Sequence, residues 1–221
     1  MSCDLTGKDL IAWRTARFFK DGNVVNLGIG LPTMCTSYLP EGVDIILQSE
    51  NGFTGLSGKA EPGKEDYRVI DSGGNWVTYA PYANFFGSEE SFSIIRGGHV
   101  DATVLGAMQV DQDGNLANWI IPGKAVAGMG GAMDLVCGAK EVIIAMMHTQ
   151  KGNHKIMKKC TLPLTAEKVV DKIITEMGVM EWVDGKLTLT EIYDDYTIDQ
   201  IKEATEAEFA VAENLKHLAA E

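Results

Sequence analysis

The 221-residue sequence lacks several patterns that would assign its class directly. Its four cysteines, Cys3, Cys35, Cys137 and Cys160, are far apart and form no CxxC pair. That spacing indicates neither a zinc site nor a disulfide framework, and scattered thiols fit a reducing compartment. No apolar run approaches the roughly 20 residues that a membrane helix needs, and the charged N-terminal stretch is not a signal peptide. We therefore expect a soluble, cytoplasmic protein with no membrane partner.

Positive charge is also scarce. Lysine and arginine number 19 against 31 aspartates and glutamates, so the formal net charge is −12. A chain this acidic repels nucleic-acid backbones and anionic membranes at long range, so neither is expected as a partner. A phosphorylated small molecule stays possible, because a local group of backbone N–H donors can bind an anion despite the net charge.

The common cofactor and nucleophile motifs are missing as well. The segments "GIGLPT" and "GMGGAM" have Thr33 and Met133 where a dinucleotide fingerprint needs its third glycine, and neither GxxxxGK[ST] nor GxSxG occurs. Metal-ligand spacing is absent too. His99 and His148 are isolated from other candidate ligands, and we expect both to be structural. The sequence thus predicts no metal and no nucleotide-type cofactor.

The residues that are present predict an α/β fold. Hydrophobic residues make up 45% of the chain and charged residues 23%, which is ordinary for a globular protein. Residues 8–20 read as an amphipathic helix, and 23–30, 31–39 and 43–50 read as strand, helix and strand. Such a βαβ unit prefers an open parallel sheet. We predict one domain over residues 1–221, built on an open, mostly parallel mixed sheet with helices on both faces.

The rest of the chain continues this alternation. Residues 57–92 mix charge, glycine and aromatics, and we expect an excursion from the sheet there. The later predicted elements are strands at 103–110 and 141–149, a glycine loop leading into a short helix at 128–140, a helix at about 166–177, a hairpin turning at Asp184-Gly185, a short helix near 198–205 and a final extended segment.

Glu50 ends the predicted strand 43–50 and opens "SENGFTGLSG". It either borders an Asn-Gly turn or is held over a crevice as a nucleophile. A two-residue hairpin at Asn51-Gly52 would require an alternating strand after it. Glycines recur instead at 52, 55 and 58, which favours a loop over a paired strand. This pattern alone leaves both roles of Glu50 open.

Four glycine-rich segments follow strand-like stretches: "NLGIGLPT", "SENGFTGLSG", "IRGGHVD" and "PGKAVAGMGGAMD". In open α/β sheets, ligands bind beyond the carboxyl ends of the strands, and glycine lets the backbone approach them closely. Glycine also punctuates any α/β fold, so these loops are candidate sites with an ordinary structural alternative.

The same segments carry a family resemblance. "SENG" at 49–52, "NLGIGLPT" at 26–33, "IRGGHVD" at 95–101, and "GNLANWIIPGK" with "GMGGAMDL" within 114–135 resemble the B (β) subunit of family I CoA-transferases. This 3-oxoacid group includes the acetate/acetoacetate and butyrate–acetoacetate enzymes. The resemblance extends from about residue 8 to about residue 215.

The resemblance implies transfer of CoA between an acyl-CoA and a short-chain carboxylic acid. Glu50 matches the catalytic glutamate, which forms an acyl-glutamyl anhydride and then a glutamyl-CoA thioester. It implies no cofactor beyond the substrate CoA thioester, and no metal. Because a glutamate is a weak nucleophile, the rate must come from placement and oxyanion stabilisation.

The resemblance also assigns supporting residues. Backbone N–H groups of Gly131 first, and then Gly130, are expected to face the reacting carbonyl. The residues expected to bind CoA or substrate are Asn26, Gly28, Gly30, Asn51 and Lys124. For Asn51, a role in shaping the turn is an equal alternative, and Arg96 is a further basic residue near these loops.

A partner is implied too. Separate-chain members of the family work with an A (α) subunit that completes the active site, so we expect a hetero-oligomer and little activity from the isolated chain. The segment "YAPYANFFGSEESF" departs from the family pattern, which leaves the acyl preference open. Tyr79, Tyr82 and Phe85 in it either wall a pocket or pack against the partner.

A non-catalytic assembly partner with a vestigial Glu50 is disfavoured by the intact SENG and GMGG motifs. Two further alternative functions stay open at this point. One is the corresponding subunit of a 3-oxoadipate/succinate-type CoA-transferase, which would need extra cationic groups in its pocket. The other is a sugar-phosphate isomerase-like protein on a similar sheet, since a fold does not determine a function. Such an isomerase would form no covalent CoA adduct.

Overall fold

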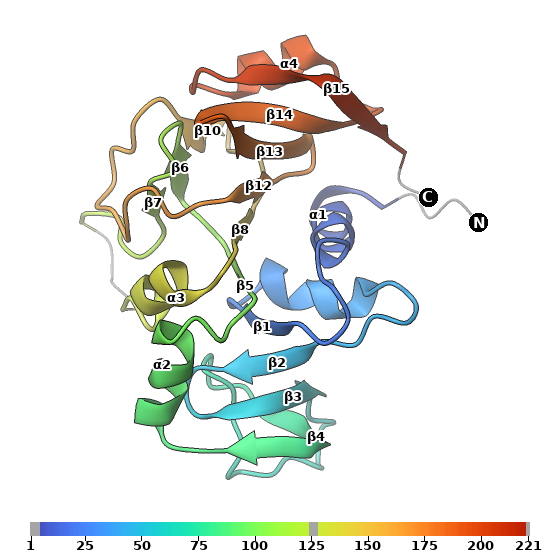
Figure 1. The fold of residues 1–221 in the computed structure, drawn as a ribbon, viewed down its shortest axis with the longest axis vertical. Helices are drawn as coiled ribbons and strands as arrows, with labels where there is room; N and C mark the ends of the chain where they lie inside the picture. Colours follow the sequence, from blue (N-terminus) through green and yellow to red (C-terminus); the bar gives the residue numbers. More distant parts are fainter. Residues whose placement is uncertain (1–4, 124–127, 220–221) are drawn as a thin grey trace.

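The computed structural model describes residues 5–123 and 128–219. A ten-stranded sheet runs through this part of the chain (Figure 1). Its strands, in spatial order, are β15 (Ala210–Leu218), β14 (Lys186–Tyr193), β13 (Gly178–Val183), β12 (Lys172–Ile174), β8 (Val142–Ala145), β5 (Ala102–Leu105), β1 (Val24–Leu27), β2 (Ile46–Ser49), β3 (Phe53–Lys59) and β4 (Val77–Phe85).

The centre of the sheet is parallel and its two ends are antiparallel. Strands β12, β8, β5, β1 and β2 all pair in parallel. On one side β3 and β4 continue antiparallel, and on the other β13 and β14 do so before β15 pairs in parallel with β14. The prediction of an open, mostly parallel mixed sheet is confirmed.

Smaller elements surround this sheet. Strands β6 (Gln109–Asp111), β7 (Leu116–Ala117) and β11 (Ile156–Met157) form a three-stranded sheet, and β9 (Thr149–Gln150) pairs with β10 (Asn153–His154). The helices are α1 (Gly7–Ala16), the 3₁₀ helix η1 (Leu31–Tyr38), α2 (Ser88–Arg96), α3 (Ala132–Gly138) and α4 (Ile198–Ala204).

Helices cover both faces of the central strands, as predicted. In Figure 1, α1 lies on one side of β1, β5 and β8, and α2 and α3 lie on the other. Strand β8 shows the reason, because all four of its residues are buried. Ile143 packs in the cluster that contains Ile11 of α1, whereas Ile144 packs in the cluster that contains Val136 of α3. Successive side chains of a strand point to opposite faces, so only a strand covered twice is apolar throughout.

Several predicted elements are confirmed. Strands β1 and β2 pair in parallel with η1 between them, although the connection is a 3₁₀ helix. The predicted N-terminal helix is α1, which ends at Ala16, and α4 lies where a short helix was expected. Asp184 and Gly185 have φ values of 51° and 76°, which suit the two central residues of a type I′ hairpin turn.

The prediction of a loop after Glu50 is wrong. Residues 53–59 form β3, which pairs with β2 and β4. The glycines of β3 allow its backbone to pack closely against β4. Gly55 has a φ of 84°, and a Cβ on it would lie 2.9 Å from Ala83 Cα of β4. The pairing of β3 with β4 shifts register on either side of Leu56, so glycine marks bulges where two backbones approach closely.

Two further predictions are corrected. Residues 57–92 are only partly an excursion, because they contain the edge strand β4 and the start of α2. The predicted helix at 166–177 is absent from the described chain, which contains β12 instead. Ile173 and Ile174 are fully buried there between β8 and β13. Tertiary pairing with two neighbours therefore overrode a weak local helical pattern.

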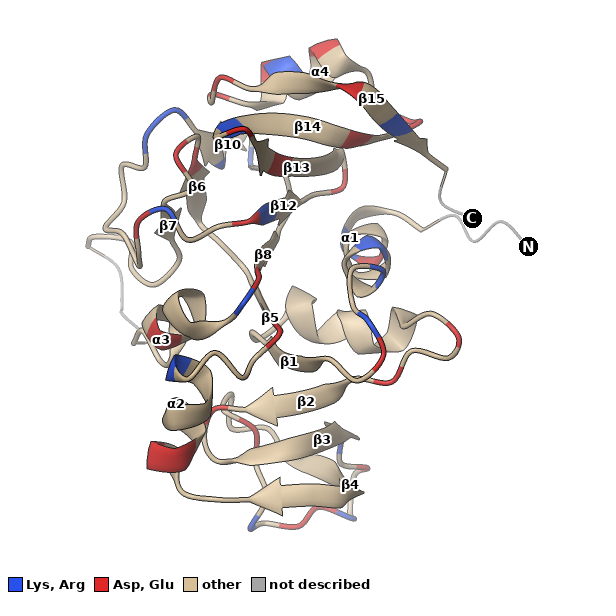
Figure 2. Ribbon diagram, in the orientation of Figure 1, with Lys and Arg blue, Asp and Glu red and all other residues tan. Residues whose placement is uncertain are grey.

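Charged residues lie mainly outside the central strands. Strands β1 and β2 carry none, and Figure 2 draws both in tan. None of the helices in the described ranges is long and apolar enough to cross a bilayer.

Candidate active site

Glu50 lies in the tight turn between β2 and β3. The turn is closed by a hydrogen bond from Gly52 N–H to the Ser49 carbonyl, at 3.1 Å. Gly52 has a φ of 133°, and a Cβ on it would lie 2.3 Å from the Phe86 carbonyl oxygen. Only glycine therefore fits here, and the turn holds Glu50 at the carboxyl end of a central strand, where ligands of such sheets bind.

Side chains within the turn fix its shape. Ser49 Oγ donates to Asn51 Oδ1 at 2.6 Å, and Asn51 Nδ2 donates to the Ile70 carbonyl at 2.8 Å. The Ser72 N–H donates to Ser49 Oγ at 3.2 Å. Asn51 thus anchors the Glu50 turn to the segment before β4. This contact agrees with the turn-shaping alternative, and a direct contact of Asn51 with substrate stays a prediction.

Gly131 brings a backbone donor to Glu50 from 81 residues away. Its N–H donates to Glu50 Oε1 at 3.1 Å. A Cβ on Gly131 would lie 3.0 Å from Glu50 Cδ and 3.2 Å from a ring carbon of Phe92. Gly130, with a φ of 56°, lies against the same oxygen, because its Cβ would be 3.5 Å from Oε1. The structure therefore brings together three residues that the sequence nominated.

This arrangement has a definite chemical capacity. The Gly131 N–H orients one carboxylate oxygen, which leaves the other free to attack an electrophile. If the Glu50 carboxyl carbon itself becomes tetrahedral, the same N–H lies at hydrogen-bond distance from the oxygen that gains negative charge. A backbone donor on a packed segment needs no reorganisation to do this.

Beneath Glu50, three buried polar side chains connect β1, β2 and α2. Asn26 Nδ2 donates to Gln48 Oε1 at 2.7 Å, and Gln48 Nε2 donates to Ser91 Oγ at 2.8 Å. Asn26 is 3% exposed, and its contact with CoA stays a prediction. Sequence reasoning missed Gln48 and Ser91. A signal existed for Gln48, since it is a polar residue directly after the apolar run "IIL" and lies two residues before Glu50.

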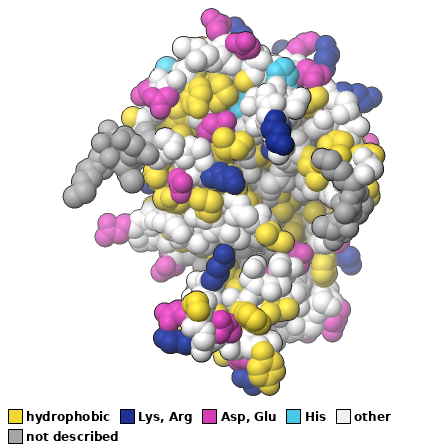
Figure 3. Space-filling view, turned by 180° about the vertical axis from the view of Figure 1, so that it is seen from behind, with side chains coloured by type: hydrophobic (Ala, Val, Ile, Leu, Met, Phe, Trp, Pro, Cys, Tyr) yellow, Lys and Arg dark blue, Asp and Glu magenta, His cyan; other side chains and the backbone are white. Residues whose placement is uncertain are grey.

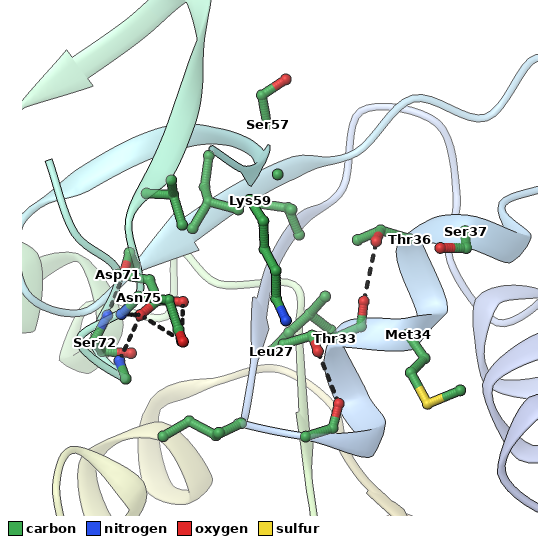
Figure 4. Close-up of a pocket in the computed structure, with 18 of the residues that line it drawn as sticks. Leu27, Thr33, Met34, Thr36, Ser37, Ser57, Lys59, Asp71, Ser72 and Asn75 are labelled. Carbon is green, nitrogen blue, oxygen red and sulfur yellow. Dashed lines mark hydrogen bonds between the residues drawn. The ribbon is translucent and has the colours of Figure 1, made fainter. Parts of the chain in front are cut away.

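A cavity of about 740 Å³ lies beside β2. Leu47, Gln48 and Ser49 of β2 border it. Figure 4 shows the Lys59 ammonium group pointing into the cavity toward Leu27 and Thr33, with Asp71 on another wall. Its size suits a small-molecule ligand.

The other nominated residues have different positions. Gly28 packs against β5, since a Cβ on it would lie 3.1 Å from the Val104 carbonyl oxygen, whereas Gly30 lines the cavity with a φ of 90°. Lys124 lies outside the described residues. Arg96 Nε bonds Asp134 Oδ1 at 2.7 Å. CoA contacts by these residues stay predictions.

The aromatic residues of β4 do not wall the described cavity. Tyr79, Tyr82 and Phe85 are exposed by 48%, 61% and 54%. Figure 3 shows hydrophobic side chains at the surface of the end of the molecule that contains β3 and β4. Packing of these residues against a partner stays a prediction.

The two isolated histidines differ in their burial and contacts. His148 is 1% exposed, and its two ring nitrogens bond the hydroxyls of Thr175 and Thr205 at 2.9 and 2.8 Å. His99 lies exposed after α2. Within residues 5–123 and 128–219, no cluster of histidine, cysteine and acidic side chains has the grouping needed to hold a metal ion.

Comparison of the sequence with known proteins gives close relatives. The beta subunit of acetate CoA-transferase from Escherichia coli K12 is 51% identical over 212 residues, which cover 96% of this chain and 97% of the relative. The B subunit of a probable succinyl-CoA:3-ketoacid coenzyme A transferase from Bacillus subtilis is 49% identical over 203 residues, covering 91% and 94%. The chain spans only 40% of a mouse mitochondrial succinyl-CoA:3-ketoacid coenzyme A transferase, to which it is 48% identical over 206 residues.

Solved structures share the fold at low identity. An acyl-CoA transferase apoenzyme from Escherichia coli O157:H7 superposes with a TM-score of 0.74 at 22% identity, over 99% of this chain and 44% of that one. Glutaconate coenzyme A-transferase from Acidaminococcus fermentans gives 0.72 at 19%, over 100% and 92%. The decarboxylase AibA/AibB gives 0.71 at 19%, over 99% and 90%, so the fold alone does not decide the reaction.

The family is decided by the sequence itself. The sequence model of the coenzyme A transferase family matches residues 8–204, which includes Glu50, Gly131 and the segments that connect them. Together with relatives about half identical over almost the whole length, this match shows that the chain belongs to the coenzyme A transferase family.

Proposed function

We propose that this chain is the B (β) subunit of an enzyme that transfers CoA between an acyl-CoA and a short-chain carboxylic acid of the acetate, acetoacetate and butyrate class. The observation that carries the proposal is the 3.1 Å hydrogen bond from Gly131 N–H to Glu50 Oε1, in a turn beyond the carboxyl end of a central strand. The relatives in Escherichia coli and Haemophilus influenzae, which are named as beta subunits of acetate CoA-transferase, support the substrate class.

The proposed reaction begins with Glu50 as the nucleophile. One carboxylate oxygen attacks the thioester carbonyl and the carbon–sulfur bond breaks. CoA departs as a thiolate, and an acyl-glutamyl anhydride is formed. The thiolate then attacks the glutamyl carbonyl and releases the acyl group as a carboxylate, which leaves a glutamyl-CoA thioester. A second carboxylate reverses both steps and takes the CoA.

Gly131 is proposed to act in the steps at the glutamyl carbonyl. Each of those steps places negative charge on a Glu50 oxygen, and the Gly131 N–H lies on Oε1. Loss of one oxyanion donor typically costs about 3 kcal/mol of transition-state stabilisation. Gly130 is proposed to leave room for the reacting group, since its Cβ would contact the same oxygen.

Part of the CoA molecule is proposed to occupy the cavity beside β2. Gly30 lines the cavity, and Gly28 lies two residues before Gly30 in the chain. Lys59 places a cation inside the cavity. Asn26, Asn51 and Lys124 complete the proposed set of CoA-binding or substrate-binding residues. No cofactor beyond the CoA thioester and no metal is proposed.

The enzyme is proposed to need an A (α) subunit. Relatives are named as beta or B subunits, and one mouse relative carries further sequence in the same chain. The exposed aromatic residues of β4 fit contact with such a partner.

We propose that the present chain is a single domain, because one sheet holds strands from β1 to β15 and Arg14 of α1 pairs with Glu191 of β14. A reducing, cytoplasmic location fits the three free cysteines among the described residues.

A succinate-type donor is the second candidate. The Bacillus subtilis and Helicobacter pylori relatives, at 49% and 47% identity, carry succinyl-CoA:3-ketoacid names. Succinate has a second carboxylate that needs a cation, and both Lys8 and Lys59 line the cavity. Comparing kcat/KM for succinate and acetate as acceptors of CoA from acetoacetyl-CoA distinguishes the two candidates.

The test is intact-mass spectrometry of the chain purified with its α subunit and incubated with acetoacetyl-CoA. We expect a CoA-sized adduct on wild type, which acetate discharges, and no adduct on Glu50→Gln. The variant should lose activity by on the order of 10⁴-fold or more, since a carboxamide cannot attack the thioester. An adduct on the variant, or none on assembled wild type with any acyl-CoA, contradicts the proposal.

A further inference from the structure

The buried polar residues beneath Glu50 form a connected set, which we name the Gln48 network: Asn26 of β1, Gln48 of β2 and Ser91 of α2. Their exposed fractions are 3%, 3% and 0%. Buried amides and hydroxyls are costly unless they are hydrogen-bonded. Apolar side chains would fill this space without that requirement, so the network calls for an explanation beyond packing.

The network holds the strand at the two residues that precede Glu50. Asn26 Nδ2 lies 3.2 Å from the Gln48 carbonyl oxygen as well as 2.7 Å from its side-chain oxygen. Ser91 Oγ accepts from Gln48 Nε2 at 2.8 Å and lies 3.4 Å from the Ser49 carbonyl oxygen, to which it donates. Side-chain bonds from β1 and α2 therefore reach both carbonyls before the turn.

The same helix leads to the backbone donor. Phe92, the residue after Ser91, lies close to Gly131, where an added Cβ would be 3.2 Å from its ring. Ile95 of α2 packs with Leu135 of α3, the helix that begins directly after Gly131. Ser91 thus ties the strand that carries Glu50 to the helix pair that carries Gly131. A displacement of one relative to the other lengthens the 3.1 Å bond between them.

We infer that Gln48 and Ser91 are positioning residues, which hold the Glu50 carboxylate on the Gly131 N–H through the Gln48 network. The inference rests on the proposed function, in which Glu50 is the nucleophile. Neither residue touches the reacting atoms. Their effect is expected on the rate of the chemical step, because reacting groups displaced by about 1 Å lose on the order of 100-fold in rate.

Two variants of the complex with the α subunit test this: Ser91→Ala, which leaves Gln48 Nε2 without its acceptor, and Gln48→Met, which keeps the length of the side chain. In single-turnover experiments with acetoacetyl-CoA, we expect both variants to form the glutamyl-CoA adduct more slowly, by about tenfold or more. The steady-state KM for acetoacetyl-CoA should change by less than about twofold in Ser91→Ala, and KM is compared for this variant alone because Gln48 lines the cavity proposed for CoA. A crystal structure of Ser91→Ala should show Glu50 Oε1 no longer within hydrogen-bond distance of Gly131 N.

Thr15→Ala is the matched control. Thr15 is also fully buried, and its hydroxyl bonds the Ile11 carbonyl within α1, away from the turn. It should lose stability as Ser91→Ala does and keep the rate of adduct formation. A purely structural role of Ser91 predicts equal behaviour of the two variants.

The outcomes separate this inference from the proposed function. Adduct formation at the wild-type rate in either folded variant overturns the positioning role, and so does a loss in Ser91→Ala that appears only in KM. If wild type forms no adduct, the proposed function fails. The crystal structure of Ser91→Ala then decides positioning alone: a retained contact between Glu50 Oε1 and Gly131 N overturns it, and a displaced carboxylate supports it.

Discussion

At the scale of single residues, the site depends on where a side chain is missing. Gly131 places its N–H on Glu50 because nothing larger than hydrogen stands between its Cα and the carboxylate. The neighbouring phenyl ring of Phe92 closes the other side of that space. Glycine is therefore needed at position 131 for a steric reason. At position 130 it is favoured by the backbone conformation, since φ is 56°.

Gly131→Ala should therefore lower kcat/KM by on the order of 100-fold. The new Cβ would lie 3.0 Å from Glu50 Cδ, so the carboxylate must move off its donor, and loss of one oxyanion donor costs about 3 kcal/mol. Steady-state kinetics of the complex with the α subunit check this. Gly106→Ala is the control, since nothing lies within 4 Å of its added Cβ. Equal activity of the two variants would contradict the role of Gly131.

At the scale of elements, the antiparallel end of the sheet holds the Glu50 turn in place. The turn is a β2–β3 hairpin, and β3 is paired on its other side by β4. The pattern of glycines in β3 suggested a loop because glycine weakens an isolated strand. In the folded protein the same glycines permit bulges against β4, which no local pattern reveals.

Gly55→Ala should lower the free energy of unfolding by about 2 kcal/mol or more. Alanine is strained at a φ of 84°, and its Cβ would lie 2.9 Å from Ala83 Cα. Urea denaturation followed by circular dichroism measures the change. Ser57→Ala, at an exposed position of the same strand, should stay within about 0.5 kcal/mol of wild type. A neutral Gly55→Ala would mean that β3 and β4 do not approach as closely as described.

At the scale of the whole molecule, His148 joins three parts of the fold. It follows β8, bonds Thr175 after β12, and bonds Thr205 at the end of α4. Burial lowers the pKa of His148 from 6.5 to about 4, with smaller contributions from the charges of His154 and Lys155. The carboxylate of Glu176 accepts the His148 backbone N–H. The neutral imidazole is therefore the form that the folded state favours.

Because of His148, the free energy of unfolding should fall as the solution becomes more acidic. A folded pKa below the unfolded value means that the contribution is present above about pH 6.5 and is lost as pH falls toward about 4. Between pH 7 and pH 5 the loss is about 2 kcal/mol. Urea denaturation at both pH values, compared with His148→Gln, measures it. An equal pH dependence in wild type and variant would remove His148 as the cause. Lys155, with its pKa lowered to about 8 by burial, stays charged in this range.

The sequence by itself determined the class of fold and the family. The βαβ unit at 23–50, the turn at Asp184-Gly185 and the segments around Glu50 could all be predicted from it. Turn chemistry and hydrophobic periodicity act over a few residues, and family motifs are written in the chain directly.

Only the tertiary structure decided which distant groups meet. It pairs Glu50 with Gly131, joins Gln48 to Ser91 across 43 positions, and turns the glycines of β3 into bulges. It also made β12 a strand, because β8 and β13 supply the hydrogen bonds on its two sides. Contacts of this kind depend on burial and on pairing between segments remote in sequence, and neither is encoded in a local pattern.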